Sequence, residues 1–207
     1  MIRQRTHPAA TQGTSRLEAF TDGVFAIAAT LLVLDLTTHA FGEITSDAEM
    51  WAALAGMWEL FFNFALSFVL LCMMWMIHVQ QFEHIARIDR GLTWLNNARL
   101  LFVVLVPFAT SMTTEYSEWM AGRLLMPVTF FMAILFSWLQ WMWAVRHRDT
   151  LLPDMSEEDA RAYGRGSLSA LLISGAVVVL SPFVGSIAFV LFFLDGPLTK
   201  LLRGKGD

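Results

Sequence analysis

The stretch that decides the fold is RLEAFTDGVFAIAATLLVLDL, residues 16–36. Its apolar part runs from Gly23 to Leu36 and contains a single carboxylate, Asp35, near its end. A helix that crosses a bilayer in contact with lipid needs about twenty apolar residues, so the ends of this shorter run are expected to meet protein or water. Small side chains in its first half allow neighbouring helices to approach closely; they are Gly23, Ala26, Ala28 and Ala29. We therefore expect a short helix packed within a helical bundle.

The composition of the whole chain predicts a polytopic, all-α membrane protein. Of its 207 residues, 56% are hydrophobic and only 15% are charged, and the apolar residues form long blocks separated by short charged loops. The net charge is −4 and no strongly basic stretch occurs, which argues against nucleic acid as a partner. The single cysteine, Cys72, lies inside an apolar run, so the chain forms no intrachain disulfide.

We expect one transmembrane domain, residues 1–207, with six helices per subunit. The apolar blocks place the spans at about 17–37, 51–82, 92–112, 119–145, 166–181 and 183–202. The second block is too long for an upright span, so it must tilt or project beyond the bilayer. The last two spans share one apolar stretch and depend on a break at Pro182.

The placement of Lys and Arg supports six spans and sets the orientation. Loops 38–50 and 112–118 contain neither residue, whereas loops 84–90 and 146–149 are basic. Because basic loops stay in the cytoplasm, both termini are predicted to be cytoplasmic. The spacing of Ser156 and Asp159 is that of a capping box and predicts a short surface helix between the fourth and fifth spans.

One stripe of the first helix combines apolar side chains with a hydroxyl. Steps of three and four residues place Gly23, Ile27, Thr30 and Leu34 on one face, with Leu31 beside them. Spacing alone favours a packing role for the aliphatic residues, with the Thr30 hydroxyl bonded to a carbonyl one turn earlier. Asp22, at the start of the helix, needs a partner or water; the candidates are Arg16, His78 and Arg99.

The beginning of this helix also resembles a known family. Arg16, Phe20, Thr21 and Asp22, followed by GVFAIAATLLVLDL, resemble the R-x-x-x-F-S-D signature of the transmembrane protein 175 family, the lysosomal potassium channels and their prokaryotic six-helix relatives. Thr replaces the usual Ser. HVQQF at 78–82 is similar to the family's H-x-x-x-F element, and LTWLNNARLLFVVLVPF at 92–108 is similar to its third helix.

The resemblance implies a homotetrameric potassium channel in the inner membrane of a prokaryotic cell, in which four copies of the first helix line the pore. Ile27 would form the narrowest ring, Thr30 a hydroxyl ring and Leu34 an outer apolar ring, with Gly23 and Leu31 also lining the path. Permeant potassium would pass these rings without a bound cofactor or resident metal. No re-entrant selectivity-filter loop of the T-V-G-Y-G kind occurs in the sequence, so an aliphatic ring must act by dewetting or by partial dehydration of the ion.

Further polar residues are predicted to support or serve this pore. The resemblance favours a collar that anchors the first helix and senses pH through His78; its members are Arg16, Phe20, Thr21, Asp22, His78, Asn97 and Arg99. Alternatively, these are ordinary helix-end residues whose charged groups reach the interface. Asp35, at the outer mouth, would concentrate cations or simply be a solvated helix end.

The sequence thus predicts a potassium-selective channel, with the bilayer, potassium ions and further copies of itself as partners. A small ion- or proton-coupled transporter, with Asp22 and His78 as carriers, is the alternative, and a membrane scaffold without permeation is a third possibility. We found no nucleophile elbow, phosphate loop or metal-ligand spacing, so no enzymatic activity is expected.

Overall fold

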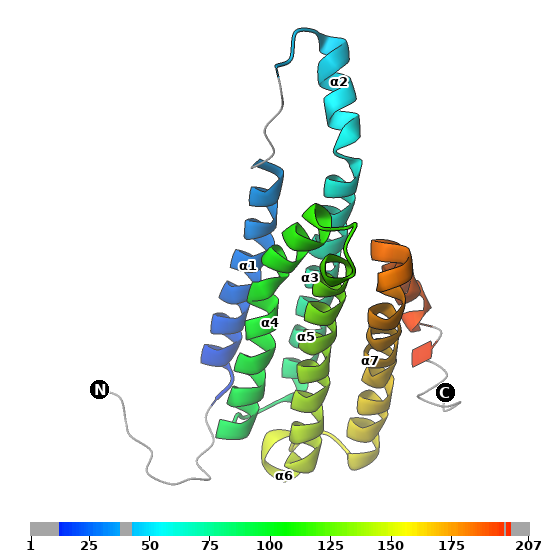
Figure 1. Ribbon diagram of the computed structural model, residues 1–207. Coiled ribbons are helices and arrows are strands. Elements are labelled where there is room, and N and C mark those ends of the chain that lie inside the picture. Colours follow the sequence, from blue (N-terminus) through cyan, green and yellow to red (C-terminus); the bar gives the residue numbers. More distant parts are fainter. Residues whose placement is uncertain (1–12, 38–42, 197, 200–207) are drawn as a thin grey trace.

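The computed structural model describes residues 13–37, 43–196 and 198–199 as a bundle of nearly parallel and antiparallel helices (Figure 1). The helices are α1 Ser15–Thr37, α2 Asp47–Gly56, α3 Trp58–His84, α4 Arg90–Glu115, α5 Met120–Arg146, the single turn α6 Arg148–Leu151, α7 Glu157–Val184 and the 3₁₀ helix η1 Gly185–Leu194. The predicted all-α membrane fold is confirmed, since five stretches of the described residues are long and apolar enough to cross a membrane.

The second predicted span, 51–82, is divided between two helices. The break falls at Met57, between α2 and α3. None of the residues of α2 is buried, and this helix projects beyond the end of the bundle (Figure 1). The excess length of the apolar block is therefore accounted for by projection, and the apolar segment within the bundle begins at Trp58.

The last apolar stretch reverses direction at Gly185 and not at Pro182. Pro182 lies in the final turn of α7, and the helix continues to Val184. Gly185 has φ of 64°, a conformation that only glycine adopts without strain, and η1 then runs back along α7. A hydrogen bond joins the two segments: the Ser169 hydroxyl of α7 donates to Asp195 Oδ1, directly after η1, at 2.5 Å. The segment that follows Gly185 thus runs in the direction that a sixth span requires.

The predicted capping box is present, but it begins a longer helix. The Ser156 hydroxyl accepts a hydrogen bond from the Asp159 N–H at 3.1 Å. Residues 157–184 then form one continuous helix, α7, and no separate surface helix precedes the fifth span. The turn of the chain before α7 is made by α6 and the loop at 152–156.

The core of the bundle lies where α4 and α5 meet the other helices. Val103 and Val106 of α4 are fully buried, as is Ala133 of α5. A second apolar cluster, around Leu92 and Trp141, closes the end of the bundle that carries the basic loops. The helix α1 lies at one edge, against α3 and α4, while α7 and η1 lie at the opposite edge (Figure 1). The helix α1, which carries the R-x-x-x-F-S-D-like sequence, is therefore peripheral within a single subunit.

Candidate permeation helix and its supports

The helix α1 has one face buried in the subunit and one face uncovered. Thr21, Phe25, Ala28 and Leu32 lie at spacings of three and four residues and are at most 4% exposed. The predicted pore stripe faces the other way; its members Gly23, Ile27, Thr30, Leu31 and Leu34 are all exposed. The exposed fraction reaches 61% for Ile27. The stripe is therefore no part of the subunit core, contrary to the packing role that spacing alone favoured.

Two further features of this stripe concern its polar residues. The hydroxyl of Thr30 donates to the carbonyl oxygen of Ile27 at 2.9 Å, as expected for a threonine within an apolar helix. The hydroxyl oxygen keeps its lone pairs and can still accept from water or face a cation. The side chain of Asp35, predicted at the outer mouth, lies outside the described part of the structure.

Thr21 is the residue by which α1 is tied to α4. Its Oγ1 accepts a hydrogen bond from Asn96 Nδ2 at 2.9 Å, and both side chains are fully buried. Asn97, the asparagine predicted to belong to the collar, is exposed. Neighbouring helical positions point about 100° apart, so only one of the two asparagines can face α1. The structure therefore places Asn96 in the collar in place of Asn97.

Asp22 is held by a residue that the sequence did not single out. Trp75 of α3 donates its indole N–H to Asp22 Oδ1 at 2.9 Å. None of the predicted partners forms an ion pair with Asp22 among the described residues; they are Arg16, His78 and Arg99. Arg16 and Phe20 are exposed at the start of α1. A tryptophan in an aromatic-rich membrane sequence gives little signal of such a role, because most tryptophans there are interfacial anchors.

His78 and Arg99 form a separate contact, one layer behind α1. The Arg99 guanidinium donates to the carbonyl oxygen of Met74 at 2.6 Å, and its Nη1 lies 3.4 Å from His78 Nδ1. It also lies 5.5 Å from the ring centre of Phe25, within range of a cation–π interaction. Arg99 is fully buried, so its charged group does not reach the membrane interface as the alternative interpretation required.

The predicted collar therefore consists of two groups with different roles. Thr21 and Asp22 connect α1 to α4 and α3 through uncharged donors, whereas His78 and Arg99 contact each other and the buried Phe25. A hydrogen bond between membrane helices contributes about 0.6–2 kcal/mol, so two of them fix the rotation of α1 with modest energy. This rotation is what leaves the Ile27 stripe uncovered.

Sequence comparison relates this chain to known channel proteins. The sequence profile of the family described as "Endosomal/lysosomal potassium channel TMEM175" matches residues 16–107. A potassium channel of Streptomyces collinus is 34% identical over 178 residues, which are 82% of this chain and 84% of the relative. The human endosomal/lysosomal proton channel TMEM175 is 30% identical over 150 residues, 68% of this chain and 30% of the human protein.

A solved structure shares the fold over nearly the whole chain. It is the crystal structure of a TMEM175 homolog from Chamaesiphon minutus, described as a lysosomal potassium-selective channel. The two structures superpose with a TM-score of 0.60 at 27% identity, covering 88% of this chain and 97% of the other. The sequence similarity thus includes the α1 signature and extends through most of a bacterial relative of similar length. The chain belongs to the TMEM175 family.

Proposed function

We propose that this protein is a potassium-selective channel in which four copies of α1 surround the permeation pathway. The observation that carries the proposal is the uncovered stripe of α1. Ile27 and Leu34 are 61% and 52% exposed on a helix whose other face is buried in the subunit. Relatives named as potassium channels, in S. collinus and C. minutus, support the choice of ion.

A single subunit encloses no pathway along this stripe, because α1 lies at the edge of the bundle (Figure 1) and Ile27 is 61% exposed. A closed ring of identical subunits would bring the stripes together around one axis. The family resemblance supports a ring of four. We infer that the homotetramer is multi-pass in the inner membrane, with both termini in the cytoplasm, from the placement of Lys and Arg.

The proposed pathway selects ions by partial dehydration. A ring of Ile27 side chains would exclude water when narrow and would strip part of the hydration shell when wider. Potassium sheds its water more easily than sodium, so selectivity is expected without a carbonyl filter. The Thr30 ring would supply hydroxyl oxygens one turn further out, Leu34 a second apolar ring, and Asp35 a negative charge that concentrates cations at the entrance.

The test is potassium flux from proteoliposomes driven only by a potassium gradient. A channel dissipates the gradient without a second substrate, a coupled transporter needs one, and a scaffold leaves the gradient intact. Ile27→Ala widens the proposed constriction and should increase resting potassium flux. Ile187→Ala is the matched control, because Ile187 is 66% exposed in η1, far from α1 in the bundle.

Two outcomes would refute the proposal. One is a resting flux that responds equally to Ile27→Ala and Ile187→Ala, since the stripe of α1 would then have no special role. The other is a protein that has the mass of a monomer in detergent and still gives full potassium flux in proteoliposomes. A tetramer with a selective response to Ile27→Ala supports both the assembly and the pore assignment.

A further inference from the structure

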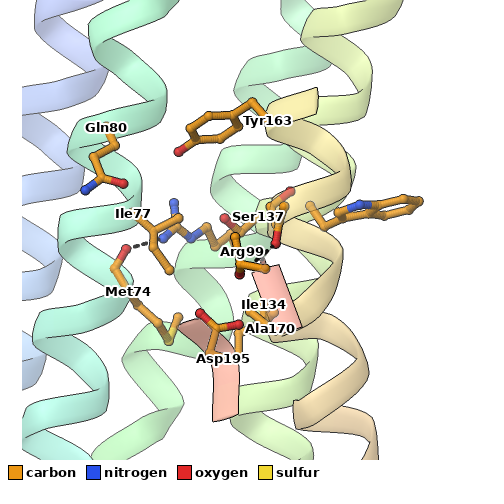
Figure 2. A pocket seen from close by; sticks show the side chains of 13 residues that line it. Met74, Ile77, Gln80, Arg99, Ile134, Ser137, Tyr163, Ala170 and Asp195 are labelled. Atoms are coloured by element: carbon orange, nitrogen blue, oxygen red, sulfur yellow. Dashed lines mark hydrogen bonds between the residues drawn. The ribbon is translucent and has the colours of Figure 1, made fainter. Parts of the chain in front are cut away.

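The interior of the subunit contains a cavity with two charged lining residues, and it is separate from the stripe of α1. It has a volume of about 160 Å³ and lies between α3 on one side and α7 with η1 on the other (Figure 2). Its apolar wall includes Met74, Ile77 and Ile134, and two of its lining residues, Arg99 and Asp195, carry opposite charges. Ile27, Thr30 and Leu34 take no part in it.

Arg99 leaves much of its hydrogen-bonding capacity unused. A guanidinium has five N–H groups, and the described residues accept two hydrogen bonds from Arg99, at Met74 and His78. Its Nε is buried without a partner. The Cα of Arg99 lies nine residues from the start of α4, which is about 13 Å along the helix axis and therefore deep within a bilayer. A charged group at this depth calls for a counter-charge and further acceptors.

Asp195 provides the opposite charge on the facing wall. Its Oδ1 accepts a hydrogen bond from the Ser169 hydroxyl of α7 at 2.5 Å, which holds the carboxylate beside the cavity. In Figure 2 the Asp195 carboxylate and the Arg99 guanidinium both lie in the space between α3 and α7. Among the described residues no ion pair joins them, although both line the cavity.

We propose that this cavity binds a small zwitterion, an amino acid whose carboxylate contacts Arg99 and whose ammonium group contacts Asp195. The two walls carry charges that such a ligand satisfies together, whereas a simple anion would face Asp195 and a simple cation would face Arg99. The short hydrocarbon part of the ligand would lie against Met74, Ile77 and Ile134. Binding at this site does not depend on which ion crosses the pathway of α1.

The size of the cavity limits the ligand. An apolar cavity of about 150 Å³ accommodates benzene, which has six non-hydrogen atoms, and this cavity is of similar volume. β-Alanine also has six non-hydrogen atoms and carries its two charges at its ends. The exposed Gln80 lines the cavity four residues before α3 ends, and Tyr163 lines it six residues after α7 begins, at the end of the bundle that carries the basic loops. Entry is therefore expected from that side.

The experiment measures equilibrium binding of radiolabelled β-alanine to the purified, detergent-solubilised protein. We expect saturable binding at one site per subunit, with unlabelled propanoate and propylamine each competing at least about tenfold more weakly than β-alanine. Glycine and 4-aminobutanoate, tested in the same way, report the ligand length that best spans the two charges. Asp195→Asn should remove the advantage of β-alanine over propanoate.

Two variants test the location without removing either charge. Ala170→Leu adds three carbons to a residue that lines the cavity and should lower the affinity at least about tenfold. Ala176→Leu makes the same change at an exposed position of α7 that does not line the cavity, and it should bind as the wild type does. The pair stays informative even if Asp195→Asn prevents folding.

Three results would overturn the proposal. The first is the absence of saturable binding of β-alanine, glycine and 4-aminobutanoate up to about 10 mM, a concentration that detects even weak sites. The second is competition by propanoate or propylamine equal to that by β-alanine, because one charge would then suffice. The third is unchanged binding in Ala170→Leu. Potassium flux, measured separately with the same preparation, tests the proposed channel function. Its presence or absence does not affect the result of the binding test.

Discussion

The two faces of α1 follow the same sequence pattern but have different surroundings. Phe25, Ala28 and Leu32 are buried among α3, α4 and the rest of the core, whereas Ile27 and Leu34 are 61% and 52% exposed within the subunit. Both faces are apolar, so hydrophobicity does not separate them. What separates them is the pair of hydrogen bonds from Asn96 to Thr21 and from Trp75 to Asp22, which set the rotation of the helix.

The comparison shows that contacts within the subunit hold α1 by one face only. The other face must be in contact with something outside the subunit. A uniformly apolar helix can rotate in a bundle at low cost, since lipid and side chains are similarly apolar. Directional hydrogen bonds remove that freedom. Substitutions on the two faces should therefore have effects of very different size, and the polar contacts should have effects between them.

The largest difference is expected between Phe25→Ala and Leu34→Ala. Removing the Phe25 ring leaves a cavity in the core and also removes the aromatic face beneath Arg99, which should lower the free energy of unfolding by about 3–5 kcal/mol. Leu34 is 52% exposed, and its truncation should change stability by no more than about 0.5 kcal/mol. Thermal unfolding of both variants in detergent measures the difference. Equal losses would show that the two faces are equally buried in the assembly.

The next largest effect concerns the contact with α4. Asn96→Leu removes the donor to Thr21 and should cost about 1 kcal/mol; the cost is limited because the variant also removes the Asn96 Oδ1, which is buried without a partner. Asn97→Leu alters an exposed position and should be nearly neutral. Denaturation midpoints of the two variants, compared at equal detergent concentration, provide the measurement. A larger loss for Asn97→Leu would support Asn97 as the collar member, as the sequence predicted.

How far the sequence predicted the site can be judged from these residues. The all-α membrane fold and the common face of Ile27, Thr30 and Leu34 follow from composition and from the 3.6-residue period, both of which are properties of the sequence alone. The choice between Asn96 and Asn97 depends on the rotation of α4 to within one residue, and no periodicity fixes that rotation. Trp75 as the partner of Asp22 depends on the same kind of information.

The errors at helix boundaries have a different origin. Hydropathy does not distinguish residues 51–56 from the span that follows, yet α2 is a separate helix because the chain bends at Gly56 and Met57. At the other end, Pro182 is the stronger breaking signal in the sequence, but a proline can be accommodated in a membrane helix, and the reversal requires the positive φ of Gly185. The reversal therefore depends on Gly185 and not on Pro182.

A smaller effect is expected at the contact between α1 and α3. Trp75→Phe keeps the ring but removes the N–H that binds Asp22, which should cost about 0.5–1.5 kcal/mol. Asp22→Asn retains an oxygen that can accept from Trp75 and should cost less, whereas an ion pair of Asp22 with one of its candidate partners in the sequence would make the charge necessary. Unfolding midpoints and the tetramer fraction by mass measure both variants. A greater loss for Asp22→Asn would indicate that an ionic partner is present in the assembly.

The smallest effect is expected at α2, where no side chain is buried and the contacts are exposed to water. The pKa of Glu49 lies below its ordinary value of 4.5 because its carboxylate accepts two hydrogen bonds from Thr45. The bond from the backbone N–H has the larger effect and the bond from the hydroxyl the smaller one. A carboxylate with a depressed pKa stabilises the folded turn fully above its unfolded pKa, and this contribution is lost as the pH falls through the lower, folded value.

The amide resonance of Thr45 should therefore keep its hydrogen-bonded position at neutral pH and shift only below pH 4.5. Glu49→Gln should remove the pH dependence while leaving potassium flux and tetramer mass unchanged, because α2 projects away from the core that positions α1. A transition above pH 4.5 would mean that Glu49 is destabilised as an anion in the assembly, as it would be if acidic residues from neighbouring subunits met around the outer mouth. In that case α2, like the Ile27 face of α1, would have its surroundings set by neighbouring subunits.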